Sequence, residues 1–376
     1  MNVADSIFWQ SRRKPSELAL AAPGTPFNLV SYSRLSIMVT NICRHLDEAN
    51  IRTGDHVAVE MADPLFRAVI AIALVRLGAV VISSIEHDHR WPFEVAAVLS
   101  DSSTWEHSGK RVLVRYDWVE EAQGEPAERG DRETRSEELC CVFSGQGAGK
   151  SGDPLCFALT HELLDARIAC QDLFMGASIS SASRLYSGED SKTPLGFQLL
   201  FSTLSRGGAL FMMGDRTLSL SALRTYKVQS AVVTPKALFD LVEFFETNPG
   251  LESGLNEIFV ADHVSKRDFE RALRILGAKI SRGYYSGPSG MIASMPSRIA
   301  DSSQGDMVGF LLPGVEADSL GEDGAPLEAG KPGVLHFQSA LAAKICGSAQ
   351  SEQQTSFLPT TQKGFVVKDR LLVFET

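Results

Sequence analysis

The chain has 376 residues, enough for a large core in more than one lobe; 44% of the residues are hydrophobic and 22% are charged. Its 36 basic and 46 acidic residues give a formal net charge of -10, and no stripe of basic residues could follow a phosphate backbone. We therefore expect no nucleic-acid partner.

The cysteines and the apolar segments bear on the cell compartment. Six cysteines are scattered without the CxxC spacing of a zinc site, and we interpret them as reduced core thiols; neighbouring Cys140 and Cys141 should point to opposite faces of a strand. The N-terminus lacks the pattern of a secretory signal. The most apolar stretch, 68–82, contains Arg76 and is, at about fifteen residues, too short for a membrane span. We expect a cytoplasmic protein.

Residues 1–138 predict a first α/β lobe, because helical and strand periodicities alternate. Its last part, 120–138, is charged and rich in glycine and proline, which predicts an exposed connection. The elements expected before that connection are a helix over 35–46 with Ser33 as a candidate cap, a strand over 56–61, a helix over 66–77 ended by Gly78 and a strand over 79–82.

Residues 139–300 predict a second α/β lobe, and residues 301–376, where glycine and proline punctuate short apolar runs, predict hairpins and a small β-barrel. The elements expected in the second lobe are strands over 139–143, 209–213, 231–234, 257–260 and 279–280 and helices over 161–174, 235–246 and 266–276, the first of them capped by Thr160.

The segment VFSGQGAGKSG, which ends at Gly152, is a glycine-rich turn after a strand and is a candidate phosphate loop. An NTPase phosphate loop needs glycine where this chain has Ser144, so a P-loop NTPase and a plain flexible turn remain as weaker alternatives. The NTPase alternative predicts that Lys150→Ala abolishes nucleotide binding.

Several landmarks follow one another along the whole chain. They are Ser31-Tyr32 through Leu35, GDHVAV at 54–59, LGAV at 77–80, a Gly/Ser loop ending in Thr160-His161, RGYYSG at 282–287, PGV at 313–315, DGAPL at 323–327 and the run from Gly330 to Leu335. Their order resembles the adenylate-forming superfamily of acyl-CoA synthetases, luciferases and nonribosomal adenylation domains. The resemblance implies the fold of that family's large N-terminal domain: two α/β lobes with mixed, largely parallel sheets plus a small C-terminal β-barrel.

The same resemblance implies a chemistry and a site. The family joins a carboxylate to the α-phosphate of ATP, releases pyrophosphate, and passes the acyl group to a thiol such as that of CoA. A small carboxylic acid or acyl compound is thus the implied ligand, and ATP or AMP the implied cofactor. The residues that would hold the nucleotide are Ser144, Gly145, Gly149, Lys150, Ser151, Gly152 and Thr160 around the phosphates and Gly283, Tyr284 and Tyr285 beside the adenine.

This sequence departs from the family pattern where charge is handled. Leu155 replaces the loop lysine, and Gly287-Pro288 replaces a Thr-Glu pair whose glutamate serves Mg²⁺. Ala261-Asp262 stands in place of paired glycines, and Gln362 in place of the ribose-binding aspartate. The small C-terminal domain with its bridging lysine is expected to be absent. Because the loss of one transition-state partner typically costs about 10²- to 10³-fold in rate, we assign no catalytic residue and expect neither Mg²⁺ nor CoA to be retained.

We therefore expect an acyl- or aryl-CoA synthetase-like protein that is impaired in adenylation and retains at most ligand binding. Two alternatives stay open: an active ligase completed by a separate small domain, and an interaction or regulatory subunit that uses the fold as a scaffold. Other sites are less favoured. Glu86-His87-Asp88-His89 is more simply a solvated loop than a metal site, Ser286 lacks the context of a serine hydrolase, and His161 and His263 are more simply packed or solvated than general bases.

Overall fold

The structure is a computed structural model that describes residues 2–83, 91–102, 110–119, 134–148, 154–175, 183–297, 307–321, 323–346, 358–368 and 370–374. Helices and strands alternate through most of the chain, and the elements after residue 276 in the described ranges are strands. Among the described residues, no helix is both long enough and apolar enough to cross a membrane.

Several helices begin or end where the sequence supplies a cap. Thr160 Oγ1 accepts a hydrogen bond from Leu163 N (3.1 Å) and so satisfies one N–H that the first helical turn leaves without an intrahelical partner. Gly78, with a φ of 75°, ends another helix in the left-handed conformation that glycine adopts most easily. The helices are α1 (Asp5–Arg13), α2 (Tyr32–Glu48), α3 (Pro64–Leu77), α4 (His161–Phe174), α6 (Pro194–Ser205), α7 (Arg216–Thr225), α8 (Pro235–Thr247) and α9 (Lys266–Leu276), with a short 3-10 helix η1 (Tyr116–Val119).

One sheet has seven strands: β3 (His56–Glu60), β4 (Val80–Ile82), β5 (Ala97–Ser100), β6 (Arg111–Leu113), β7 (Leu139–Ala148), β8 (Pro154–Thr160) and β18 (Lys344–Cys346). Their order is β18-β8-β7-β4-β3-β5-β6. The strands from β7 to β6 are parallel, whereas β7-β8 and β8-β18 are antiparallel. A strand from the C-terminal part of the chain thus completes the edge next to the β7–β8 hairpin.

The other sheet has thirteen strands: β1 (Leu18–Ala21), β2 (Leu29–Ser31), β9 (Arg184–Ser187), β10 (Ala209–Phe211), β11 (Ser230–Val233), β12 (Glu257–Ala261), β13 (Lys279–Ser286), β14 (Gly290–Met295), β15 (Met307–Leu311), β16 (Val315–Leu320), β17 (Gly333–Ser339), β19 (Leu358–Val367) and β20 (Arg370–Phe374). Their order is β16-β17-β19-β20-β15-β14-β13-β12-β11-β9-β10-β1-β2. The stretch from β13 to β1 is parallel, and antiparallel strands flank it on both sides.

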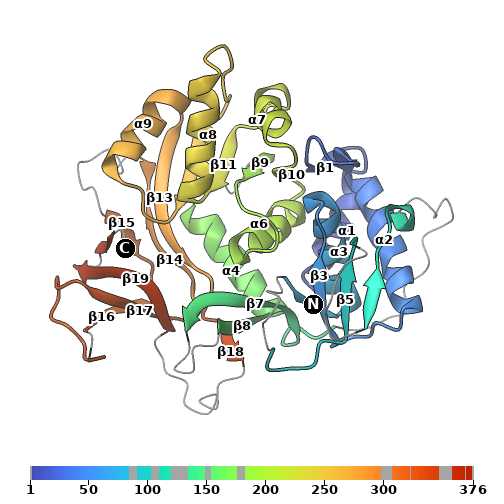
Figure 1. Cartoon of the computed structure of the whole chain (residues 1–376), viewed down its shortest axis with the longest axis horizontal. Helices are drawn as coiled ribbons and strands as arrows, with labels where there is room; N and C mark the ends of the chain where they lie inside the picture. Colours follow the sequence, from blue (N-terminus) through green and yellow to red (C-terminus); the bar gives the residue numbers. More distant parts are fainter. Residues whose placement is uncertain are drawn as a thin grey trace.

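Successive residues of the central strands point to opposite faces of the large sheet, so that a core forms on each face. Leu185 of β9 belongs to the core between the two sheets, whereas its neighbour Tyr186 belongs to the core under α7, α8 and α9. The first core also contains fully buried residues of α2, α3, α4 and α6, so these helices form a layer between the sheets (Figure 1). Helices on both faces of a largely parallel sheet are the α/β architecture that the sequence predicts.

Several element boundaries differ from the sequence prediction, and two of the differences concern residues that it named as a cap or as site candidates. The cap of α2 is Ser31 and not Ser33: Ser31 Oγ accepts a hydrogen bond from Arg34 N (3.3 Å). The two-residue strand predicted at 279–280 extends as β13 to Ser286, so the three candidate adenine residues lie in a strand and not in a turn. Gly283 permits this because the Phe259 ring lies where a Cβ would project.

No disulfide joins any of the six cysteines in the structure. The prediction that Cys140 and Cys141 point to opposite faces is wrong, because their Sγ atoms are 3.7 Å apart. The cause is an irregularity between Leu139 and Cys141, where β7 has one residue more than β8 opposite it.

The small barrel predicted for 301–376 is not confirmed. In the described residues its longer strands pair antiparallel and continue the thirteen-stranded sheet through β14 and β15, and the order of that sheet is open, ending at β16. β18 instead joins β8 of the other sheet. The division into lobes at 138 and 300 stays a prediction.

Candidate functional site

The candidate phosphate loop is flanked by an antiparallel hairpin. Ser144 and Gly145 lie in β7, opposite Cys156 and Leu155 of β8, and Thr160 follows directly as the cap of α4. The other candidates of this group, Gly149, Lys150, Ser151 and Gly152, lie outside the described residues. The strand–loop–strand–helix order therefore agrees with the predicted loop, whose own tip is not described.

His161, the first residue of α4, is a packed histidine. It is 1% exposed, and its Nδ1 accepts a hydrogen bond from Val3 N (3.3 Å). Burial disfavours the imidazolium and lowers the pKa of His161 from 6.5 to about 4. The side chain is neutral at pH 7 and has no access to a substrate, which agrees with its interpretation as structural.

This pKa predicts a specific loss of stability in acid. Below pH 6.5 the unfolded chain binds a proton at His161 that the folded chain does not bind until about pH 4, so the folded state loses stability as the pH falls through this window. In His161→Asn, Oδ1 can accept the Val3 bond without titrating. Between pH 7 and pH 4 we expect this variant to lose about 3 kcal/mol less unfolding free energy than the original chain, as measured by urea denaturation. Equal losses would contradict the assignment.

Arg167, two turns further along α4, holds the turn between β13 and β14. Its guanidinium is buried, with Nη1 donating to Gly287 O (2.9 Å), Nη2 donating to Pro288 O, and both Nε and Nη2 donating to Leu341 O (2.9 and 2.8 Å). The acceptors are backbone carbonyls, and burial lowers the pKa of the guanidinium. A positive charge therefore lies behind Gly287 and Pro288, the two residues that stand in place of a Thr-Glu pair by resemblance.

Tyr285 connects this turn to the interior. Its phenol lies beside the Arg167 guanidinium and donates a hydrogen bond to Gln198 Oε1 of α6 (3.2 Å). Burial raises the pKa of Tyr285, and the neighbouring guanidinium opposes that rise. Gln198 Nε2 in turn donates to Arg167 O (3.0 Å), so α4, α6 and the end of β13 share one polar network.

Tyr284, on the opposite face of β13, lies in a second polar cluster. Its phenol makes a side-chain hydrogen bond with Thr360 of β19, and the Asp262 carboxylate is near enough to add to the effect of burial in raising the pKa of Tyr284. The Tyr284 ring also packs on Phe337 at a centroid distance of 5.4 Å. Gln362, which stands at the ribose-binding position by resemblance, donates its backbone N–H to Thr360 Oγ1 (3.2 Å).

Asp262 occupies a backbone conformation made for glycine. Its φ is 136°, a value that non-glycine residues rarely adopt, and its N–H donates to Gly283 O (2.8 Å) in the neighbouring strand. Burial raises the pKa of the Asp262 carboxyl, while a hydrogen bond from His263 N to Oδ1 (2.7 Å) opposes that rise. This conformation agrees with the predicted replacement of a glycine, and it leaves a strained, partly buried carboxylate.

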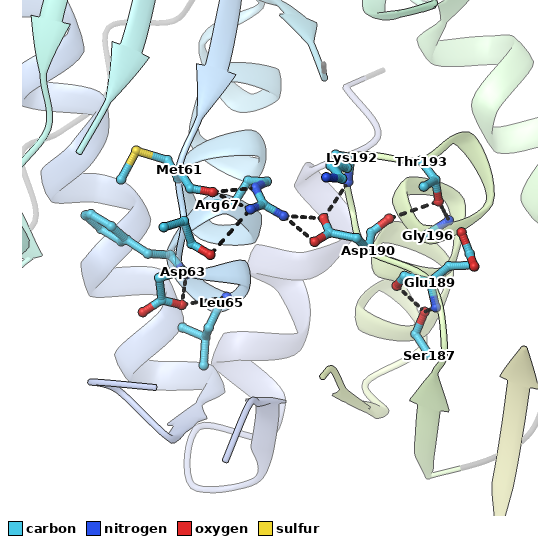
Figure 2. A network of polar contacts seen from close by, with 12 residues as sticks. Met61, Asp63, Leu65, Arg67, Ser187, Glu189, Asp190, Lys192, Thr193 and Gly196 are labelled. Carbon is cyan, nitrogen blue, oxygen red and sulfur yellow. Dashed lines mark hydrogen bonds and ion pairs between the residues drawn. The ribbon is translucent and has the colours of Figure 1, made fainter. Parts of the chain in front are cut away.

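A third network joins the two sheets near the carboxyl end of β9. Figure 2 shows Arg67 of α3 pointing at Asp190, which follows β9, and the two side chains form an ion pair in which Arg67 is 12% exposed. Arg67 Nε also donates to Met61 O (3.0 Å). Glu189, beside Asp190, accepts a hydrogen bond from Thr234 at the end of β11 (2.8 Å). The ends of β9 and β11 are thereby fixed relative to α3.

The structure therefore brings together part of what the sequence singled out. Asp262 and Tyr285 lie at or just beyond the carboxyl ends of the neighbouring strands β12 and β13. Glu189, which the sequence analysis did not single out, lies beyond the carboxyl end of β9, with β11 between β9 and β12. This is the edge where parallel sheets bind ligands. Sequence reasoning missed Arg167, whose partners are 120 to 174 residues away. The candidate metal cluster Glu86-His87-Asp88-His89 lies outside the described residues, and the part of the chain that is described has no group of three metal-capable side chains.

Comparison with known proteins identifies the fold. No protein-family model matches the sequence, and no curated protein matches it. Solved structures do match: VinN, with a TM-score of 0.79 at 16% identity over 100% of this chain and 99% of that one, has also been solved with L-aspartate. A long-chain-fatty-acid-CoA ligase from Archaeoglobus fulgidus gives a TM-score of 0.81 at 16% identity over 100% of this chain and 84% of the ligase. The amide bond synthetase McbA from Marinactinospora thermotolerans gives a TM-score of 0.76 at 18% identity over 100% of this chain and 79% of the synthetase.

The chain therefore has the fold that its sequence landmarks predict, that of the large domain of adenylate-forming enzymes. The similarity extends over the whole chain and includes both sheets. With identities below 20% it establishes the fold alone.

Proposed function

We propose that this protein binds an adenine nucleotide, ATP or AMP, together with a small carboxylic acid or acyl compound, and that it has little adenylation activity. The observation that carries the proposal is the convergence of Asp262, Tyr284 and Thr360. Tyr284 of β13 is the residue that the family resemblance places beside the adenine, Asp262 directly follows β12 in place of a glycine, and Thr360 of β19 lies two residues before Gln362, which stands at the ribose-binding position by resemblance. Their meeting in space supports a retained nucleotide site with altered side chains.

The weak-activity part of the proposal rests on charge. Adenylation needs a cation and Mg²⁺ against the phosphates while pyrophosphate leaves. Mg²⁺ prefers carboxylate and phosphate oxygens. At Gly287-Pro288, however, the carbonyls accept hydrogen bonds from the buried Arg167 guanidinium, and its charge opposes a divalent cation. The residues at this turn therefore do not fit Mg²⁺, and we derive no step through it.

The nucleotide-binding test is calorimetric titration of ATP and of AMP into the purified protein, with and without Mg²⁺. We expect binding in the micromolar range, about -8 kcal/mol, that changes little when Mg²⁺ is added. A GTP titration controls for recognition of phosphate alone and should be weaker. Undetectable binding of both ATP and AMP would refute the nucleotide site and leave the scaffold alternative as the better explanation.

Turnover is measured separately, as pyrophosphate exchange into ATP with a panel of aliphatic, aromatic and amino acids. We expect exchange to stay at the level without acid. Exchange that depends on one acid would contradict the proposed impairment and show a working adenylation site, whether or not a separate small domain then completes the second step.

A further inference from the structure

Two cysteines lie opposite each other at the edge of the seven-stranded sheet. In the antiparallel pair of β8 and β18, Cys156 is the direct partner of Cys346, and no disulfide joins them. Directly opposed residues in antiparallel strands have Cα atoms about 4.5 or 5.5 Å apart, depending on the hydrogen-bonding pattern. Both values lie within the range of about 4.4–6.8 Å that disulfides span. The register therefore places the two Cα atoms within the range that a disulfide spans, so that a bond needs no change of register.

This pair adjoins the candidate phosphate loop. Ser144 of β7 is the direct partner of Cys156 on the other side of β8, so one transverse row runs Ser144, Cys156, Cys346. Side chains of directly opposed residues point to the same face of a sheet. On that face Cys346 packs against the apolar cluster that contains Val142 and Ala158. A bond between the two cysteines would fasten β18 to the hairpin that carries the loop.

The two thiols differ in accessibility. Cys156 is 4% exposed, and burial together with Cys346 raises its pKa to about 11. Cys346 is only partly buried; burial raises its pKa as well, but Lys344 opposes the rise. Because the thiolate is the reacting form, Cys346 is the thiol that meets a reagent first, and the reaction is faster at alkaline pH. The other close pair, Cys140 and Cys141, is completely buried and out of reach of a dissolved oxidant.

We propose that Cys156 and Cys346 are a thiol–disulfide site that closes when the protein meets a small-molecule disulfide. The Cys346 thiolate attacks one sulfur of glutathione disulfide, forms a mixed disulfide and releases one glutathione thiolate. The Cys156 thiolate then attacks the Cys346 sulfur and releases the second glutathione. Two protein thiols are oxidised, one glutathione disulfide is reduced to two thiols, and the two cysteine protons pass to the released thiolates. This site does not depend on the proposed nucleotide function.

Peptide mapping of the full chain tests the proposal. The protein is incubated with glutathione disulfide at pH 8, blocked with N-ethylmaleimide and digested with trypsin, which places Cys156, Cys346 and the Cys140-Cys141 pair in three separate peptides (151–167, 345–363 and 136–150). We expect peptides 151–167 and 345–363 to be joined with the loss of two hydrogens and to separate on reduction. Peptides that stay separate and alkylated, or a bond within 136–150, would overturn the assignment.

Thermal unfolding gives an independent readout. A bond that closes a loop of this length constrains the unfolded chain, so the oxidised protein should melt about 5 °C higher than the reduced one. Cys346→Ser should lose both the joined peptide and the shift. Cys43→Ser is the matched control, since Cys43 lies in α2, away from this edge, and a serine can still donate to Ala73 O; it should keep both. A shift that survives in Cys346→Ser would also reject the proposal.

Discussion

Arg167→Met should lose about 3–5 kcal/mol of unfolding free energy, because it removes the charged hydrogen-bond donor of three backbone carbonyls. The side-chain volume is nearly conserved, so the cause is not a cavity. The carbonyls of Gly287, Pro288 and Leu341 would lose their charged donors, and each buried acceptor left unsatisfied costs about 1–3 kcal/mol. The measurement is urea denaturation at pH 7, in which the midpoint should fall while the slope stays the same.

A matched control variant distinguishes the effect of losing the buried hydrogen-bond network from the effect of losing one positive charge. Arg216 forms ion pairs with Asp240 and Glu243 and is 47% exposed, so Arg216→Met should change the unfolding free energy by no more than about 0.5 kcal/mol. Arg167→Lys should fall between the original chain and Arg167→Met, because one ammonium cannot present donors to both sides as the guanidinium does. Equal stability of the two methionine variants would show that Arg167 does not hold the turn.

Local caps accompany two accurately predicted helices, although α6 and α7, which Thr193 and Asp215 cap, were not predicted. The helix over 266–276 was placed with both ends correct, because Ser265 caps its start and Gly277 ends it in the left-handed conformation. The helix over 161–174 was equally well placed behind Thr160. By contrast, α1 was not predicted: its N-cap, Ala4, makes no side-chain cap bond, and the helix is held by long-range contacts such as Gln10 Nε2 to Ser205 O (2.8 Å).

Long-range pairing was out of reach of the sequence for a physical reason. β1 pairs in parallel with β10, about 190 residues later, so the N-terminal strands join the large sheet, and no periodicity records such a partner. Likewise, Arg167 falls on α4 like any other helical arginine, and only the fold shows that carbonyls surround it. Positions where this chain departs from the family's landmarks could, in contrast, be identified from the sequence. A carboxylate at a glycine position, Asp262, could be flagged by resemblance alone, and its φ of 136° then agreed with a position made for glycine.

Asp262→Gly should stabilise the folded protein and, under the proposed function, tighten ATP binding about tenfold, or about 1.4 kcal/mol. A non-glycine residue in a sparsely populated region costs about 1–3 kcal/mol, which glycine avoids in the folded state while giving back roughly 1 kcal/mol through the more flexible unfolded chain. Removal of the side chain also takes a negative charge and its bulk away from Tyr284, beside the proposed adenine position. The measurements are urea denaturation and calorimetric titration of ATP without Mg²⁺.

Asp262→Asn separates strain from charge, because it keeps the side-chain shape and the backbone conformation but cannot ionise. The folded-state pKa of Asp262 is raised, so the stability contributed by protonation is present below about pH 3.9 and is lost as the pH rises through the folded pKa. At pH 7 the asparagine variant should therefore regain the unfolding free energy that the buried charge removes. The glycine variant should regain, in addition, the free energy that the strained backbone conformation costs. The affinity for ATP should be highest in the glycine variant, intermediate in the asparagine variant and lowest in the original chain with aspartate. If the three proteins bind ATP equally, Asp262 does not face the nucleotide, and the site must be sought at another part of the strand edge.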